Sequence, residues 1–140
     1  MQLIDSERPM EMTTEMPQQS LADQPNIIHM SDEDLLAIAH PMWEDLIRYS
    51  NKGQYGKFIR KFSYNLLLGL NEIEVGKQFA KSDLTRNLDP NYDFLGTIRR
   101  GEHVTVLYRV RSTKKEGEWL GRMVLGYEQG EIKIFAASIF

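Results

Sequence analysis

The sequence contains no cysteine and only three histidines. Without cysteine the chain can form no disulfide bond, no thiolate metal site and no cysteine nucleophile. His29, His40 and His103 lie far apart in the sequence and show no HExxH or other metal-ligand spacing. We therefore expect no metal site and no cofactor, and we interpret His40, which precedes Pro41, as a structural or surface residue.

Long apolar runs are absent as well, and no stretch approaches the ~18 residues that cross a bilayer. The start of the chain, Met1 to Asp5, lacks the basic and apolar regions of a secretory signal. These absences predict no membrane partner and a cytoplasmic location.

No Gly-x-Ser-x-Gly elbow is present, and the segment Gly96–Gly101 lacks the lysine of a phosphate-binding loop. Serine hydrolysis of that type and nucleotide hydrolysis are therefore not expected.

The overall composition is that of an ordinary globular protein. Hydrophobic residues make up 41% and charged residues 26% of the 140 residues, which predicts one domain. The formal net charge of -3 argues against a dedicated nucleic-acid partner. Basic residues do gather in the predicted strands, but aromatic stacking partners on that face are lacking apart from Phe135. We interpret these side chains as solvated surface and edge protection: Arg99, Arg100, Arg109, Arg111, Lys114, Lys115 and Arg122.

Residues 1–30 differ from the rest of the chain. They hold five of the seven methionines, three of the five prolines and no aromatic residue. Because proline disfavours a long helix or a central strand, we predict an extended tail over 1–30 and one domain over 31–140.

Charge is also unevenly distributed along the chain. Residues 1–50 carry a net charge of -8 and residues 51–140 a net charge of +5. This split predicts either an acidic arm beside a basic partner-binding body or, the interpretation we favour, two halves that neutralise each other.

Helical patterns come first in the body of the chain. Apolar residues recur at spacings of three and four between Leu35 and Ile47, which predicts a helix that begins at Ser31 and ends near Gly53. Pro41 falls inside this helix and is expected to kink it. A second helix is predicted over residues 54–68, a third begins after Asn71, and residues 82–92 are typical of a loop.

Strand patterns follow. Alternating residues predict four strands, over residues 93–99, 103–112, 118–127 and 131–140, joined by short turns. Helices followed by an antiparallel meander predict an α+β fold, with the helices packed on one face of a curved sheet. The last two strands are apolar on both faces, so we expect the outer face to be covered. A second subunit, which would form a homodimer through the sheet, is the cover we favour; the tail around Ile27 and Ile28 is the alternative.

Three short motifs carry a family resemblance. Tyr55-Gly56-Lys57-Phe58, Leu95-Gly96 and the strand Val104-Thr105-Val106-Leu107-Tyr108-Arg109-Val110 resemble a small bacterial branch, of unknown function, of the nuclear-transport-factor-2-like superfamily. The resemblance covers about residues 33–140 and implies a cystatin-like α+β cone with a cavity between helices and sheet. Isomerases and cyclases of this superfamily use a carboxylate on the cavity wall, although the fold also hosts binding modules.

Two function hypotheses follow, and we favour the first. A non-catalytic binding or interaction module would hold a small apolar ligand between helices and sheet, against Trp43, Tyr55, Phe62, Tyr108 and Met123. The alternative is a cofactor-free acid–base enzyme, similar to the isomerases and cyclases, in which Asp93 is the base. The enzyme requires a buried Asp93 that faces Tyr55 or Tyr108. The binding module predicts Asp93 in solvent and an outer sheet face that pairs with another chain.

Overall fold

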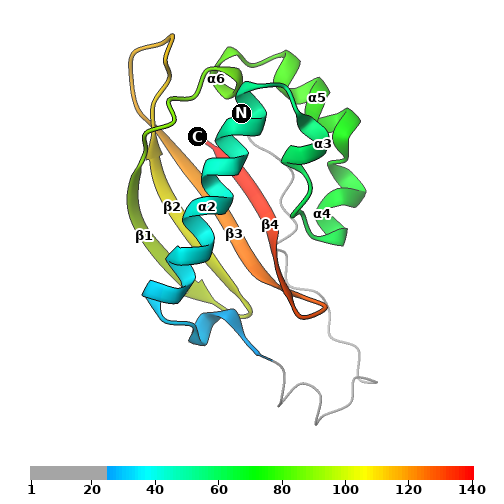
Figure 1. The fold of residues 1–140 in the computed structure, drawn as a ribbon, viewed down its shortest axis with the longest axis vertical. Coiled ribbons are helices and arrows are strands. Elements are labelled where there is room, and N and C mark those ends of the chain that lie inside the picture. Colours follow the sequence, from blue (N-terminus) through cyan, green and yellow to red (C-terminus); the bar gives the residue numbers. More distant parts are fainter. Residues whose placement is uncertain (1–24) are drawn as a thin grey trace.

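Helices form the first part of the described chain and strands form the second. The structure is a computed structural model that describes residues 25–140 (Figure 1). The helical part holds a 3-10 helix and five α-helices, in the order η1 (Ile27–His29), α2 (Asp32–Asn51), α3 (Tyr55–Phe58), α4 (Tyr64–Gly69), α5 (Glu72–Ala80) and α6 (Asp83–Arg86). The strands follow as β1 (Asp93–Arg100), β2 (His103–Val110), β3 (Trp119–Glu128) and β4 (Glu131–Ile139).

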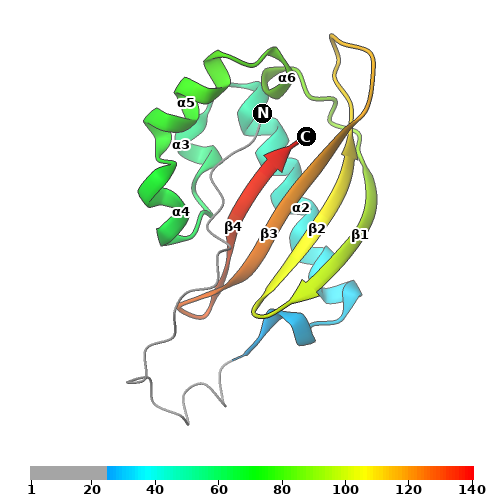
Figure 2. The same ribbon diagram turned by 180° about the vertical axis from the view of Figure 1, so that it is seen from behind.

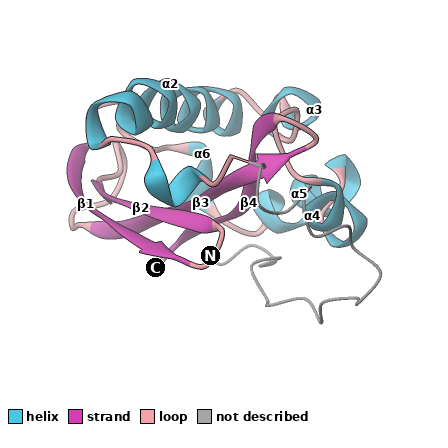
Figure 3. Cartoon of the chain, turned by 90° about the horizontal axis from the view of Figure 1, so that it is seen from below, coloured by secondary structure: helices cyan, strands magenta, loops and turns pink. Residues whose placement is uncertain are grey.

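The four strands form one antiparallel sheet in the order β1-β2-β3-β4, so each strand pairs with its neighbour in the sequence. The long helix α2 lies diagonally across one face of this sheet, which we call the inner face (Figure 1). Helices α3, α4 and α5 gather at the β4 end of the sheet (Figure 3). The predicted α+β fold class, in which helices precede and cover a four-stranded antiparallel sheet, is confirmed.

The start of α2 follows directly from its sequence. The Ser31 hydroxyl accepts a hydrogen bond of 3.1 Å from the Asp34 backbone N–H, and three acidic residues lie in the first turn. Both features stabilise a helix N-terminus. The helix continues through Pro41 to Asn51 and buries its predicted apolar stripe against the sheet.

The region after α2 differs from the prediction of a single helix over residues 54–68. There the chain forms α3 and α4, with the strand-like segment 61–63 between them. Ile134 of β4 donates its N–H to the Lys61 carbonyl at 2.7 Å, and Ser63 donates its N–H to the Ile134 carbonyl at 2.8 Å. Because these backbone groups bind the edge of β4, they are unavailable to a helix. The predicted loop over residues 82–92 also contains a short helix, α6.

The first described residues belong to the core. Ile27 in η1 has no exposed surface and packs within the same apolar cluster as the inner-face residues of β2 and β3. The Asn26 side chain donates a hydrogen bond of 3.2 Å to the Gly101 carbonyl in the β1–β2 turn. The proposed cover of the outer face by Ile27 is therefore wrong, because this side chain completes the inner core. The rest of the predicted tail, residues 1–24, lies outside the described residues.

Gly121 of β3 provides a test of the packing between α2 and the sheet. A Cβ atom at this position would lie 2.4 Å from Cζ2 of Trp43, whose ring is stacked on Tyr108. We expect Gly121→Ala to lower the free energy of unfolding by about 1–3 kcal/mol, because the indole must move. Equilibrium unfolding in urea measures this change.

Gly76→Ala in helix α5 is the matched control. Its new Cβ atom would meet Tyr55 at an ordinary contact distance of 3.4 Å. Since alanine favours a helix over glycine by about 1 kcal/mol, this variant should be as stable as the original chain or more stable. Equal unfolding midpoints for the two variants would contradict the close contact at Gly121.

Candidate functional site

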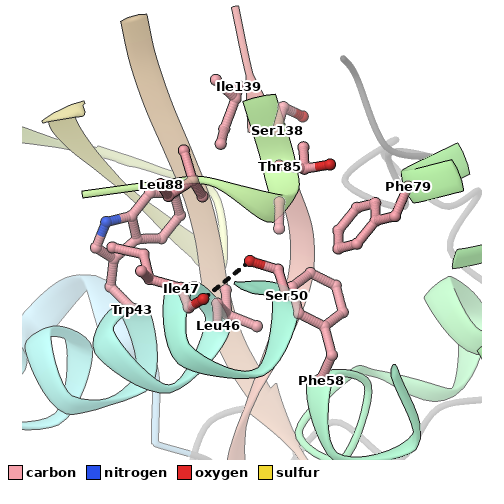
Figure 4. A pocket seen from close by; sticks show the side chains of 11 residues that line it. Trp43, Leu46, Ile47, Ser50, Phe58, Phe79, Thr85, Leu88, Ser138 and Ile139 are labelled. Carbon is pink, nitrogen blue, oxygen red and sulfur yellow. Dashed lines mark hydrogen bonds between the residues drawn. The ribbon is translucent and has the colours of Figure 1, made fainter. Parts of the chain in front are cut away.

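An apolar pocket lies where the C-terminal half of α2 meets α3, α5, α6 and the end of β4 (Figure 4). The space open to water-sized molecules is about 30 Å³, and the empty space reaches about 360 Å³ only when the open mouth is included. The lining is almost entirely carbon, and only three hydroxyl groups belong to it. The lining residues are Trp43, Leu46, Ile47, Ser50, Phe58, Phe79, Thr85, Leu88, Ala137, Ser138 and Ile139.

Hydrogen bonds and ring contacts hold the walls of this pocket. The Asn51 side chain at the end of α2 accepts from the Leu88 N–H at 2.9 Å and donates to the Leu88 carbonyl at 2.8 Å. This pair of bonds ties the segment after α6 to α2. On the opposite wall the rings of Phe58 and Phe79 meet edge to face, with their centroids 5.1 Å apart. The pocket is therefore lined by side chains that other contacts already position.

Two polar atoms of the lining residues stand out within the described part of the chain. Nε1 of Trp43 and Oγ of Ser138 are buried and have no hydrogen-bond partner. By contrast, the Ser50 hydroxyl donates to the Ile47 carbonyl at 3.0 Å, and the Thr85 hydroxyl donates to the Ser82 carbonyl at 3.2 Å. A buried polar atom without a partner costs about 1–3 kcal/mol. Ser138 is paired in register with Arg122, so its side chain points to the opposite face of the sheet from Ala137 and Ile139.

The five predicted ligand residues do not form one site. Among them only Trp43 lines the pocket. Phe62, Tyr108 and Met123 are buried in the core, each with at most 2% of its surface exposed. Tyr55 is half-buried, and its ring packs edge to face on Phe79 with 5.2 Å between the centroids.

Tyr108 is instead part of a polar and aromatic cluster between α2 and the sheet. Its hydroxyl lies 3.0 Å from Nδ1 of His40, and the rings of Tyr92 and Phe94 pack around the same imidazole. The Tyr92 hydroxyl donates a hydrogen bond of 2.6 Å to the Glu44 carboxylate. Burial raises the pKa of both Tyr108 and Tyr92, and the nearby carboxylate adds to this effect. Both phenols therefore keep their protons: Tyr92 donates to Glu44, and the contact between Tyr108 and His40 joins α2 to β2.

Asp93, the candidate base, lies on the outer face of the sheet and does not face Tyr55 or Tyr108. Its carboxylate pairs with Arg111 at 2.9 Å and with Arg109 at 3.3 Å. Glu118 joins the same two guanidinium groups at 3.2 and 3.5 Å. The hydrogen bond from Arg111 lowers the pKa of Asp93, and Arg109 acts in the same direction. A general base at neutral pH needs the opposite shift.

Two of the pocket residues that were not predicted come from the predicted loop. Thr85 and Leu88 lie in and after α6, and the signal that could have revealed this helix is Ser82. Its hydroxyl accepts from the Thr85 N–H at 3.4 Å, the pattern of a helix N-cap. Phe79 lies in α5, the helix predicted to begin after Asn71, but nothing in the local sequence shows that it approaches β4.

Residues 25–140 contain no cluster of three or more histidine or carboxylate side chains that could hold a metal ion. No helix in the same range is both long enough and apolar enough to cross a membrane. Comparisons of the chain with protein-family models, with curated proteins and with solved structures gave no match. The resemblance to the nuclear-transport-factor-2-like superfamily therefore stays a prediction.

The titration of Asp93 distinguishes a surface ion pair from a catalytic base. We expect its carboxyl carbon, followed by NMR, to titrate below the ordinary value of 3.8. Because the folded-state pKa is lowered, this group stabilises the fold above the unfolded pKa and loses that effect as the pH falls. Asp93→Asn should therefore reduce the loss of stability on acidification below about pH 4. A midpoint above the ordinary value would revive the acid–base hypothesis.

Proposed function

We propose that this protein is a non-catalytic binding module that accepts a small apolar group in the pocket beside β4. The group would be a single ring or a branched aliphatic chain, either free or on a larger partner. The observation that carries this proposal is the lining: eight of its eleven residues are apolar, and they come from α2, α3, α5, β4 and the segment after α6. Burial of an apolar group against such a surface contributes roughly 25 cal/mol for each Å² removed from water.

The walls of the pocket support binding more than catalysis. Its three hydroxyl groups belong to serine and threonine, and no histidine, carboxylate or lysine lines it. Among the described residues, Asp93 pairs with two arginines on the other face of the sheet. The pocket therefore offers apolar contact, but no group for proton transfer near neutral pH. The homodimer through the sheet and the cytoplasmic location stay predictions.

Binding of toluene tests the proposal. In a uniformly ¹⁵N-labelled chain, we expect toluene to shift the amide signals of Ser50, Thr85 and Leu88 and the indole signal of Trp43. The Trp119→Phe variant assigns that indole signal, because the chain has only two tryptophans. Shifts spread evenly over the protein, or none at saturating toluene, would contradict the proposal.

Two substitutions of Ser50 provide the matched comparison. Ser50→Leu adds a side chain that occupies the pocket, so the affinity for toluene should fall at least about tenfold, or 1.4 kcal/mol. Ser50→Ala removes the hydroxyl and leaves the pocket open, so it should bind toluene as the original chain does. Thermal unfolding of both variants checks that each is folded.

A further inference from the structure

The outer face of the sheet, which is turned away from α2, combines an apolar centre with basic surroundings. Strand register places Val124 beside Ala136 at this centre, and neither side chain has any exposed surface. The described helices do not lie over them, because α2 is on the inner face and α3, α4 and α5 are beside β4 (Figure 2). An apolar centre that is excluded from solvent without a covering helix indicates that another segment belongs on this face.

The charge of this face indicates what kind of segment it is. By alternation along the strands, the face carries a set of five basic residues, namely Arg100, Arg109, Arg111, Arg122 and Lys133. Asp93 and Glu118 balance Arg109 and Arg111 at one end of the sheet, and Glu131 pairs with Lys133 at 3.2 Å. The face thus suits an extended segment that has both carboxylates and apolar side chains.

We propose that residues 1–24 of the same chain bind this outer face. They carry a net charge of -4, from five carboxylates (Asp5, Glu7, Glu11, Glu15 and Asp23) and Arg8. Apolar residues alternate with these charges in groups of one or two: Leu3, Ile4, Met10, Met12, Met16 and Leu21. The carboxylates complement the arginines, while the methionines, which adapt to irregular surfaces, complement the apolar centre.

The segment begins at the right place and is long enough. Residue 25 precedes Asn26, which is bound to the Gly101 carbonyl at the β1–β2 turn, the lower end of the sheet. Twenty-four residues span up to roughly 80 Å when extended, whereas a strand of eight to ten residues spans about 30 Å. Attachment in the same chain also gives a high effective concentration, so weak contacts suffice, whereas a second copy must lose its translational freedom.

Paramagnetic NMR on the full chain tests this proposal. The absence of native cysteine allows one nitroxide label at Met12→Cys, and a second sample carries it at Met16→Cys. We expect the label to broaden the amide signals of Thr105, Leu107 and Val124 on the outer face. Signals of α2, on the inner face, should broaden less, because α2 lies farther from the label. Each sample is compared with its reduced, diamagnetic form.

Two controls determine the origin of the broadening. In the labelled chain, the triple variant Glu7→Gln, Glu11→Gln and Glu15→Gln should reduce the broadening at least twofold, and so should high salt. A mixture of labelled chains without ¹⁵N and ¹⁵N chains without the label should show no broadening. Broadening in that mixture would assign the face to a second copy and overturn the proposal. Stronger broadening on α2 than on the outer face, or none at either label position, would also overturn it.

Discussion

The packing of one indole ring sets the distance between the long helix and the sheet. Trp43 of α2 stacks on Tyr108 with 4.8 Å between ring centroids, and its six-membered ring lies directly over Gly121. Only a residue without a side chain allows this approach, so glycine in β3 and tryptophan in α2 depend on each other. The same contact brings His40, one turn earlier in α2, within hydrogen-bond distance of Tyr108.

The pocket is a consequence of how the remaining helices meet this helix–sheet unit. Segment 61–63 pairs with the edge of β4. Helix α3 precedes this segment in the chain and α5 follows it, and both lie beside β4. Asn51 then ties the segment around Leu88 back to the end of α2. Helices that converge from different directions cannot fill the space between them completely, and the apolar pocket remains where they meet.

The two faces of the sheet differ in chemistry, and this difference separates the two proposals. The inner face is apolar and covered by helices, so binding there depends on shape and on apolar area. The outer face is basic, so binding there depends on charge and on ionic strength. Part of the opposite net charge of residues 1–50 and residues 51–140 is neutralised within the fold, because Arg99 of β1 pairs with Asp32 of α2 at 2.7 Å.

The sequence by itself determined the elements whose signals are local. Ser31 and Asn71 cap helices through hydrogen bonds to residues three positions later, and alternation along each strand defines both of its faces. Tertiary structure alone decided the break at 61–63, the burial of Ile27, the arginine partners of Asp93 and the residues that line the pocket. Each of these depends on contacts between residues far apart in the chain, such as Ser63 with Ile134, and a pattern read over neighbouring residues carries no information about them.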